Sequence, residues 1–111
     1  MTFGYVVRPK ADRDVDDLAD SIAEFSGLDT ALVFLSDIHD TFALIATQPE
    51  MGWPSKIDHP QLRTARTFRV SDRFDEILIF YLPSGDRVEI LRVLHGAQDL
   101  PVLFSKAGAL D

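Results

Sequence analysis

The 111-residue sequence has no cysteine. A disulfide framework is therefore excluded, and so is any metal or redox site that depends on thiolates. A signal-peptide pattern is also missing, because the polar residues 8–14 follow directly on a short first apolar stretch. No apolar run approaches the roughly 20 residues that a transmembrane helix needs. We therefore expect a cytoplasmic protein without a membrane segment.

The motifs of common enzyme classes are absent as well. The sequence has no P-loop, no G-x-G-x-x-G, no H-E-x-x-H and no G-x-S-x-G nucleophile elbow. His39 has no second histidine at i+4, and His59 lies in a proline-rich loop, so both are interpreted as surface residues. The acidic residues between Asp12 and Asp20 are best explained as the solvated face of a helix. We expect neither a metal nor a cofactor.

Basic residues are too few for a general nucleic-acid binder. The chain has 11 Lys and Arg against 18 Asp and Glu, a net charge of -7, so we expect no direct DNA binding. The excess acidity lies in residues 1–50, which carry three basic and ten acidic residues. Residues 51–111 carry eight of each, so the second half of the chain could still present a local basic face.

The length and the turn residues predict one domain over residues 1–104, followed by a frayed tail at 105–111. Two amphipathic helices come early in the chain, because apolar residues recur with alternating spacings of four and three. Gly27 separates them, Asp29 is the expected N-cap of the second helix, and Pro49 follows its end. Such a short connection predicts an antiparallel helical hairpin. The two stripes are Ala11, Val15, Leu18, Ile22 and Phe25, then Ala31, Leu35, Ile38, Phe42 and Ile45.

Residues 49–64 contain three prolines and a glycine and predict an ordered loop. We expect Met51 and Trp53 to anchor this loop by burying their side chains.

The chain is organised around residues 76–96, where two β-prone runs flank a Pro-Ser-Gly-Asp turn and predict a central hairpin. In the second run, strict alternation would place Val88, Ile90 and Arg92 on one face, with Leu91 and Val93 on the other. Two further strands are expected near residues 4–8 and 66–70. The order is therefore β-α-α-β-β-β: an α+β fold with the helical hairpin packed on a four-stranded, mostly antiparallel sheet.

Arginines and one histidine are the candidate site residues. Arg66 and Arg69 could bind a phosphate or a carboxylate, because a guanidinium group binds either ion bidentately. Arg92 and His95 lie near the end of a strand that a glycine terminates, where a histidine could serve as an acid or base. Solvated strand-edge charge explains the arginines equally well, and His95 could instead hold the turn.

Several segments occur together in an order that is typical of one family. They are the Y-x-x-R-P-x-A stretch from Tyr5 to Ala11, residues 41–52, the Arg66 strand, residues 77–81 and residues 88–100. On these segments the sequence resembles the RelE/ParE toxins of bacterial type II toxin–antitoxin systems, specifically the ParE-like branch. The resemblance covers nearly the whole chain and implies the same β-α-α-β-β-β fold.

The resemblance also implies partners. ParE-like toxins resemble DNA gyrase inhibitors without hydrolytic chemistry, whereas RelE-like toxins cut messenger RNA on the ribosome. This chain has Asp75-Glu76 and Ala97-Gln98-Asp99 where the ribonucleases are basic, which favours the ParE-like branch. A cognate antitoxin would form a hetero-oligomer with the chain. Across the helical hairpin and the adjacent sheet we expect it to contact Leu18, Ile22, Phe25 and Tyr81.

Three hypotheses follow. The first is a gyrase inhibitor, neutralised by its antitoxin, that contacts its target through Arg69, Arg92 and His95. The second is an endoribonuclease with Arg66, Arg69, Arg92 and His95 as catalytic candidates. The third is a non-toxic relative that only binds an antitoxin, since a net charge of -7 is unusual among the active toxins.

Overall fold

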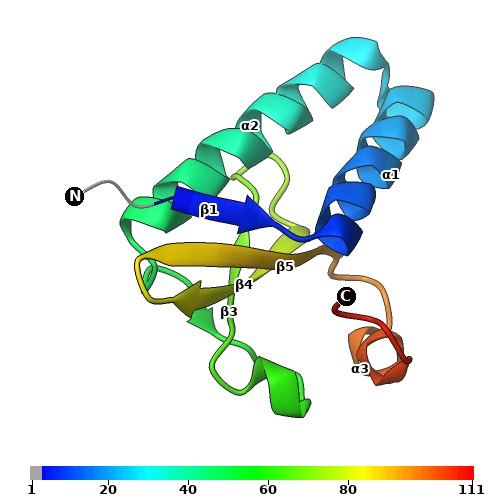
Figure 1. The fold of residues 1–111 in the computed structure, drawn as a ribbon. Coiled ribbons are helices and arrows are strands. Elements are labelled where there is room, and N and C mark those ends of the chain that lie inside the picture. Colours follow the sequence, from blue (N-terminus) through cyan, green and yellow to red (C-terminus); the bar gives the residue numbers. More distant parts are fainter. Residues whose placement is uncertain (1–3) are drawn as a thin grey trace.

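The computed structural model describes residues 4–111 and contains two long helices, a mixed sheet and a short third helix (Figure 1). The sheet order is β1-β5-β4-β3-β2, with β1 parallel to β5 and every other neighbouring pair antiparallel. The elements are β1 (Gly4–Val7), α1 (Pro9–Ser26), α2 (Leu28–Thr47), β2 (Trp53–Pro54), the 3-10 helix η1 (Pro60–Leu62), β3 (Arg66–Arg69), β4 (Ile77–Ser84), β5 (Arg87–His95) and α3 (Leu100–Ser105). The predicted α+β class is confirmed; the two-residue β2 makes five strands instead of four.

A single glycine joins the two long helices. Gly27 has φ +96°, a conformation that favours glycine, and its N–H closes the last turn of α1 by donating to Ala23. The carbonyl of Gly27 then accepts the N–H of Ala31 in the first turn of α2. The expectation that Asp29 caps the second helix is therefore wrong, because the chain reverses within one residue and α2 already begins at Leu28.

The helical hairpin covers one face of the sheet and forms the first core there (Figure 1). By length and composition α2 could cross a membrane, but its apolar face is buried in this core, as in the core helix of a folded domain. The fully or nearly buried residues of the first core are Ala11, Val15, Phe34, Ile38, Phe42, Ile45, Val70, Ile77, Ile79, Tyr81, Val88, Ile90 and Val93.

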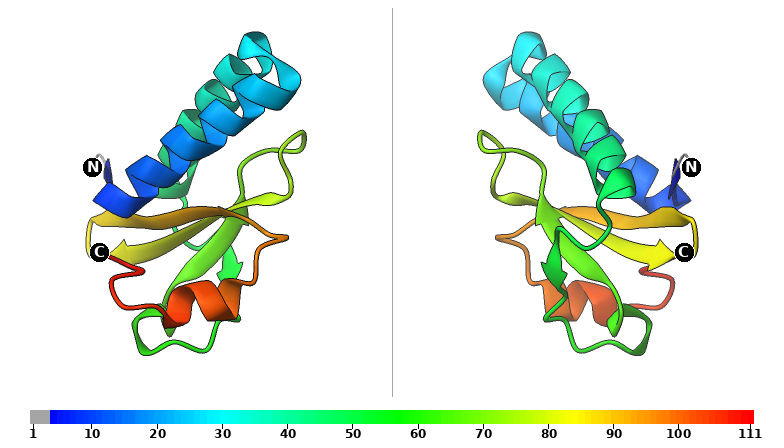
Figure 2. Two further views of the ribbon diagram at one scale, coloured as in Figure 1. Left: turned by 90° about the vertical axis from the view of Figure 1, so that its right-hand side faces the viewer. Right: turned by 90° about the vertical axis from the view of Figure 1, so that its left-hand side faces the viewer.

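A second core covers the opposite face of the sheet. The 55–65 loop, α3 and the C-terminal residues pack there (Figure 2). Ala109 and Leu110 are only 6% and 4% exposed, so the expectation of a frayed tail over residues 105–111 is wrong at these positions. This core contains Leu62, Ala65, Phe80, Leu91, Leu94, Phe104, Ala109 and Leu110. The sheet is therefore buried on both faces.

A β-bulge in β5 changes which residues face each core. Tyr81 pairs with Ile90 but Phe80 pairs with Arg92, so one residue of β5, Leu91, has no partner in β4. Leu91 faces the second core, opposite to Ile90, and the extra residue then shifts the alternation so that Val93 faces the first core again. The expectation that Leu91 and Val93 share one face of the sheet is therefore wrong. The expectation that Arg92 shares a face with Val88 is wrong for the same reason. An extra residue in one strand interrupts the alternation of its side chains between the two faces.

Candidate functional site

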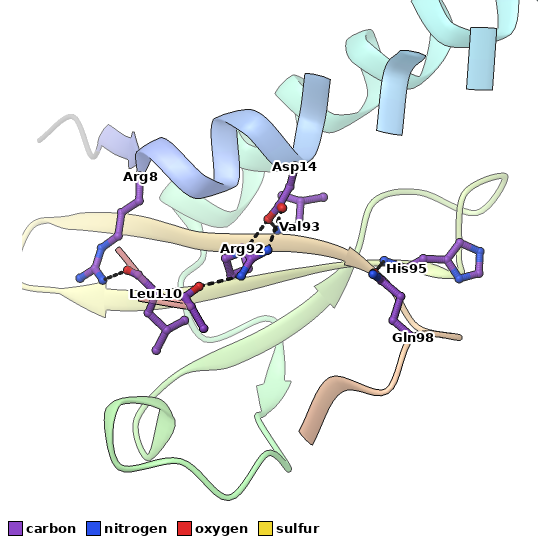
Figure 3. Close-up of polar contacts among 8 residues, drawn as sticks. Arg8, Asp14, Arg92, Val93, His95, Gln98 and Leu110 are labelled. Atoms are coloured by element: carbon purple, nitrogen blue, oxygen red, sulfur yellow. Dashed lines mark hydrogen bonds and ion pairs between the residues drawn. The ribbon is translucent and has the colours of Figure 1, made fainter. Parts of the chain in front are cut away.

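Arg92 is largely buried, and its guanidinium group binds other parts of the same chain. Its Nε and Nη2 atoms donate to the Asp14 carboxylate at 2.7 and 2.9 Å, and Nη1 donates to the Ala109 carbonyl at 2.6 Å (Figure 3). The Asp14 carboxylate also accepts the Val93 N–H at 3.0 Å. The side chains of Arg92 and Asp14 are 10% and 12% exposed. The predicted catalytic or target-binding role of Arg92 therefore does not fit the structure.

A second arginine holds the tail in a similar way. Arg8 pairs with Glu89 at 3.2 Å. It also donates through Nη1 to the Leu110 carbonyl at 3.0 Å (Figure 3). Both arginines thus bind an acid on one side and a carbonyl of the C-terminal segment on the other. Three of these contacts, those of Arg8 with Glu89 and Leu110 and that of Arg92 with Asp14, join residues about 80 to 100 positions apart, so no local sequence pattern predicts them.

His95 holds the turn after β5. Its ring Nδ1 accepts the Ala97 N–H at 3.1 Å. Its backbone N–H donates to Gln98 Oε1 at 3.1 Å (Figure 3). In the neutral ring this leaves the proton on Nε2, which lies 3.4 Å from the Glu76 carboxylate. The sequence left open whether His95 serves as an acid or base or holds the turn, and these contacts fit the second interpretation.

The remaining two arginines lie on β3, separated from Arg92 and His95 by β4. Arg66 Nη1 donates to the Gly52 carbonyl at 2.6 Å. Arg69 pairs with the exposed Asp72 at 3.1 Å. The four predicted ribonuclease residues therefore do not converge on a common point, because each side chain is bound to a different part of the chain.

Tyr81 is fully buried at the base of the 49–54 loop. Its hydroxyl donates to the Pro49 carbonyl at 2.7 Å and accepts the Gly52 N–H at 3.0 Å. Burial raises the pKa of the Tyr81 phenol, and the Gly52 N–H and nearby Arg66 oppose this increase. A direct contact between Tyr81 and an antitoxin is ruled out in this conformation, because no part of the ring reaches the surface.

The helical hairpin extends beyond the sheet toward its tip (Figure 2). The other predicted antitoxin contacts, Leu18, Ile22 and Phe25, all lie on α1. Leu18 lines a cleft of about 300 Å³ that it shares with Arg92 and Leu103. Ile22 lines a smaller cleft of about 190 Å³ that also includes His95. One turn further, Phe25 is 81% exposed. Leu28 and Leu32 extend this apolar surface around the tip of the hairpin, at 67% and 54% exposure.

A further cleft of about 570 Å³ lies between the end of α2 and the β4–β5 turn. Its lining includes Glu50, Asp86 and Arg87, but these side chains are exposed and make none of the hydrogen bonds or ion pairs found over residues 4–111. Across the same residues, no group of three or more His, Asp or Glu side chains could hold a metal ion. The folded chain thus offers surfaces and shallow clefts, not an enclosed polar pocket.

These surfaces and this topology agree with the comparison to known families. Residues 5–100 match the sequence model of the ParE toxin of type II toxin–antitoxin systems, parDE. The chain belongs to the ParE toxin family. A chain of the chromosomal ParDE TA system from P. aeruginosa has the same fold, with a TM-score of 0.68 at 22% identity. The match covers 86% of this ParE family chain and 96% of that chain. No protein with a curated description is significantly similar in sequence.

Proposed function

We propose that this ParE family chain is a cytoplasmic toxin that inhibits DNA gyrase and is neutralised by a cognate antitoxin. The match to the ParE toxin model over residues 5–100 is the observation that carries the proposal. The arrangement of two candidate arginines supports it: Arg66 and Arg92 are engaged in holding the fold, so neither is free to stabilise the charge of a phosphate that is being cleaved.

The antitoxin is proposed to bind along α1 at Leu18, Ile22 and Phe25. Partly exposed apolar side chains beside two clefts with polar and charged linings are typical of a peptide-binding site. Six acidic and two basic residues occupy α1, so a partner segment rich in Lys and Arg complements its charge. The complex would be a hetero-oligomer in which this surface becomes buried.

The rates of DNA and protein synthesis after induction of the chain without its antitoxin test the proposal. A gyrase inhibitor stops DNA synthesis first, and the purified chain then abolishes supercoiling by purified gyrase. Immediate loss of translation would establish the ribonuclease alternative. Unchanged growth, with antitoxin binding retained, would establish the third hypothesis, a non-toxic relative.

A further inference from the structure

Three side chains form a surface at the β2–β3 edge of the sheet, which we call the Trp53 surface: Trp53, Phe68 and Arg69. The Trp53 and Phe68 rings lie 5.9 Å apart between centroids, and the Arg69 guanidinium carbon lies 5.1 Å from the centroid of the Phe68 ring. Trp53 is 41% exposed, so the expectation that it anchors the loop by burial is wrong; Met51, which packs against the first core, has that position instead. An exposed tryptophan beside an arginine is the composition that dominates protein-binding hot spots.

Hydrogen bonds from the side chains of Arg66 and Tyr81 fix the loop that carries Trp53. Arg66 donates to the Gly52 carbonyl, and the Tyr81 hydroxyl bonds both Pro49 and Gly52. On the other side of Trp53, the Ser55 N–H donates to the Ala65 carbonyl. The Trp53 ring is therefore held on an ordered backbone, which reduces the conformational entropy that this loop loses when a partner binds.

The segment that carries the Trp53 surface has a net charge opposite to that of the rest of the chain. Residues 51–73 contain five basic and two acidic residues, whereas the remainder contains six basic and sixteen acidic residues. Within residues 4–111 the one carboxylate that pairs with Arg69 is Asp72, whose side chain is 94% exposed, and such surface pairs contribute little free energy. A carboxylate of a partner can therefore replace Asp72 at little cost.

We propose that the Trp53 surface docks an acidic segment of a protein partner that has an apolar anchor residue. The anchor packs on the Trp53 and Phe68 rings while a carboxylate pairs with Arg69. The segment lies across the face of the edge and does not extend the sheet, because Pro54 of β2 has no N–H to donate. In the terms of the proposed function this is the target side of the toxin, separate from the α1 surface proposed for the antitoxin.

A short acidic peptide fits this location better than a nucleic acid. Charges are screened over about 8 Å at physiological salt, so a peptide that stays on the Trp53 surface meets mainly residues 51–73. A nucleic acid carries charge along its whole backbone and would run into the acidic remainder of the chain. Aromatic stacking alone would accept either ligand, so charge distribution decides between them.

Titration of the isotope-labelled chain tests the docking without reference to any target. The probe is a 14-residue peptide in which glutamates flank a Leu-Phe pair, and the control is the same peptide with glutamines. We expect the Trp53 indole N–H and the Phe68 and Arg69 amides to shift, with at least tenfold weaker binding of the glutamine peptide. No localised shift, or tighter binding of oligo(dT)12 than of the acidic peptide, would overturn the proposal.

The second experiment links the surface to growth arrest. After induction of Trp53→Ala or Arg69→Glu, at least ten times as many cells should survive as after induction of the wild type. Both variants should keep the wild-type melting temperature and antitoxin affinity. Val102→Ala, an equally exposed apolar change on α3, should remain fully active. If the wild-type chain itself causes no arrest, the proposed function fails and the peptide titration alone decides on the surface. Full arrest by folded Arg69→Glu would show that the target binds elsewhere.

Discussion

The Asp14 carboxylate and the Arg92 guanidinium, 78 positions apart in the chain, form a two-point ion pair that also joins α1 to β5. β1 pairs with β5 only as far as Ile90, and beyond it Asp14 accepts the Val93 N–H that a longer strand would have bound. Because the same arginine binds the Ala109 carbonyl, one side chain connects the first helix, the last strand and the C-terminal segment (Figure 3).

Replacing Arg92 should unfold the protein more than it affects any target. Arg92→Ala leaves the Asp14 carboxylate without its buried partner, a change that typically lowers the free energy of unfolding by about 3–5 kcal/mol. Urea denaturation measures this loss. The exposed Arg87→Ala is the matched control and should change stability by less than about 0.5 kcal/mol. If the Arg92→Ala variant is stable but no longer arrests growth, Arg92 contacts the target after all.

Tyr81 should make stability fall at alkaline pH. Burial raises its pKa in the folded state above the usual value of 10.0, so the folded chain keeps the phenolic proton to higher pH than the unfolded chain does. The stabilisation is complete below about pH 10 and is lost as the pH rises further. Denaturation at pH 8 and pH 11 should show a larger loss for the wild type than for Tyr81→Phe. Equal losses would mean that other groups cause the decline.

At neutral pH, Tyr81→Phe should itself be destabilising. The change removes the acceptor of the Gly52 N–H and the donor to the Pro49 carbonyl, which costs about 1–3 kcal/mol for buried groups left unpaired. Amide exchange at Gly52 should accelerate with it. Unchanged exchange would show that the Tyr81 hydroxyl does not fix the loop.

Phe25→Asp should weaken antitoxin binding without unfolding the chain. The Phe25 side chain is 81% exposed, so its loss removes little packing from the free protein. A large apolar residue at the centre of an interface is typically worth about 2 kcal/mol or more, or roughly 30-fold in the dissociation constant. Calorimetric titration with the antitoxin measures the change, and Val102→Asp on α3 serves as the control. Equal affinity of the two variants would place the antitoxin away from the α1 surface.

Gly52→Ala should disturb the Trp53 surface through the backbone. A Cβ atom at this position would lie 2.5 Å from the Tyr81 hydroxyl and 2.7 Å from the Thr67 carbonyl oxygen, so the loop or β3 must shift. We expect a loss of about 1–3 kcal/mol, as for other overpacked positions. Gly4→Ala, where the added atom meets nothing within 4 Å, is the control. Tryptophan fluorescence should change for Gly52→Ala alone.

Local periodicity in the sequence was sufficient to predict the helical hairpin, the central β4–β5 hairpin and the α+β class. The apolar stripes of α1 and α2 predicted most of the core that these helices contribute, because helical spacing is a property of near neighbours. The segment order also carried the resemblance that the match to the ParE toxin family confirmed. The short β2, α3 and the buried tail were missed, since each is stabilised mainly by distant parts of the chain.

The tertiary structure decided which candidate residues are available. The bulge at Leu91 moved Arg92 off its expected face, and Asp14 then neutralised it from another element. Tyr81, expected at the antitoxin surface, is buried and holds the 49–54 loop, whereas Trp53, expected to be buried, is exposed. The sequence records which groups are charged or aromatic, but their burial and partners depend on strand register and on contacts across 30 to 100 residues. Those long-range contacts exist only after the sheet has formed.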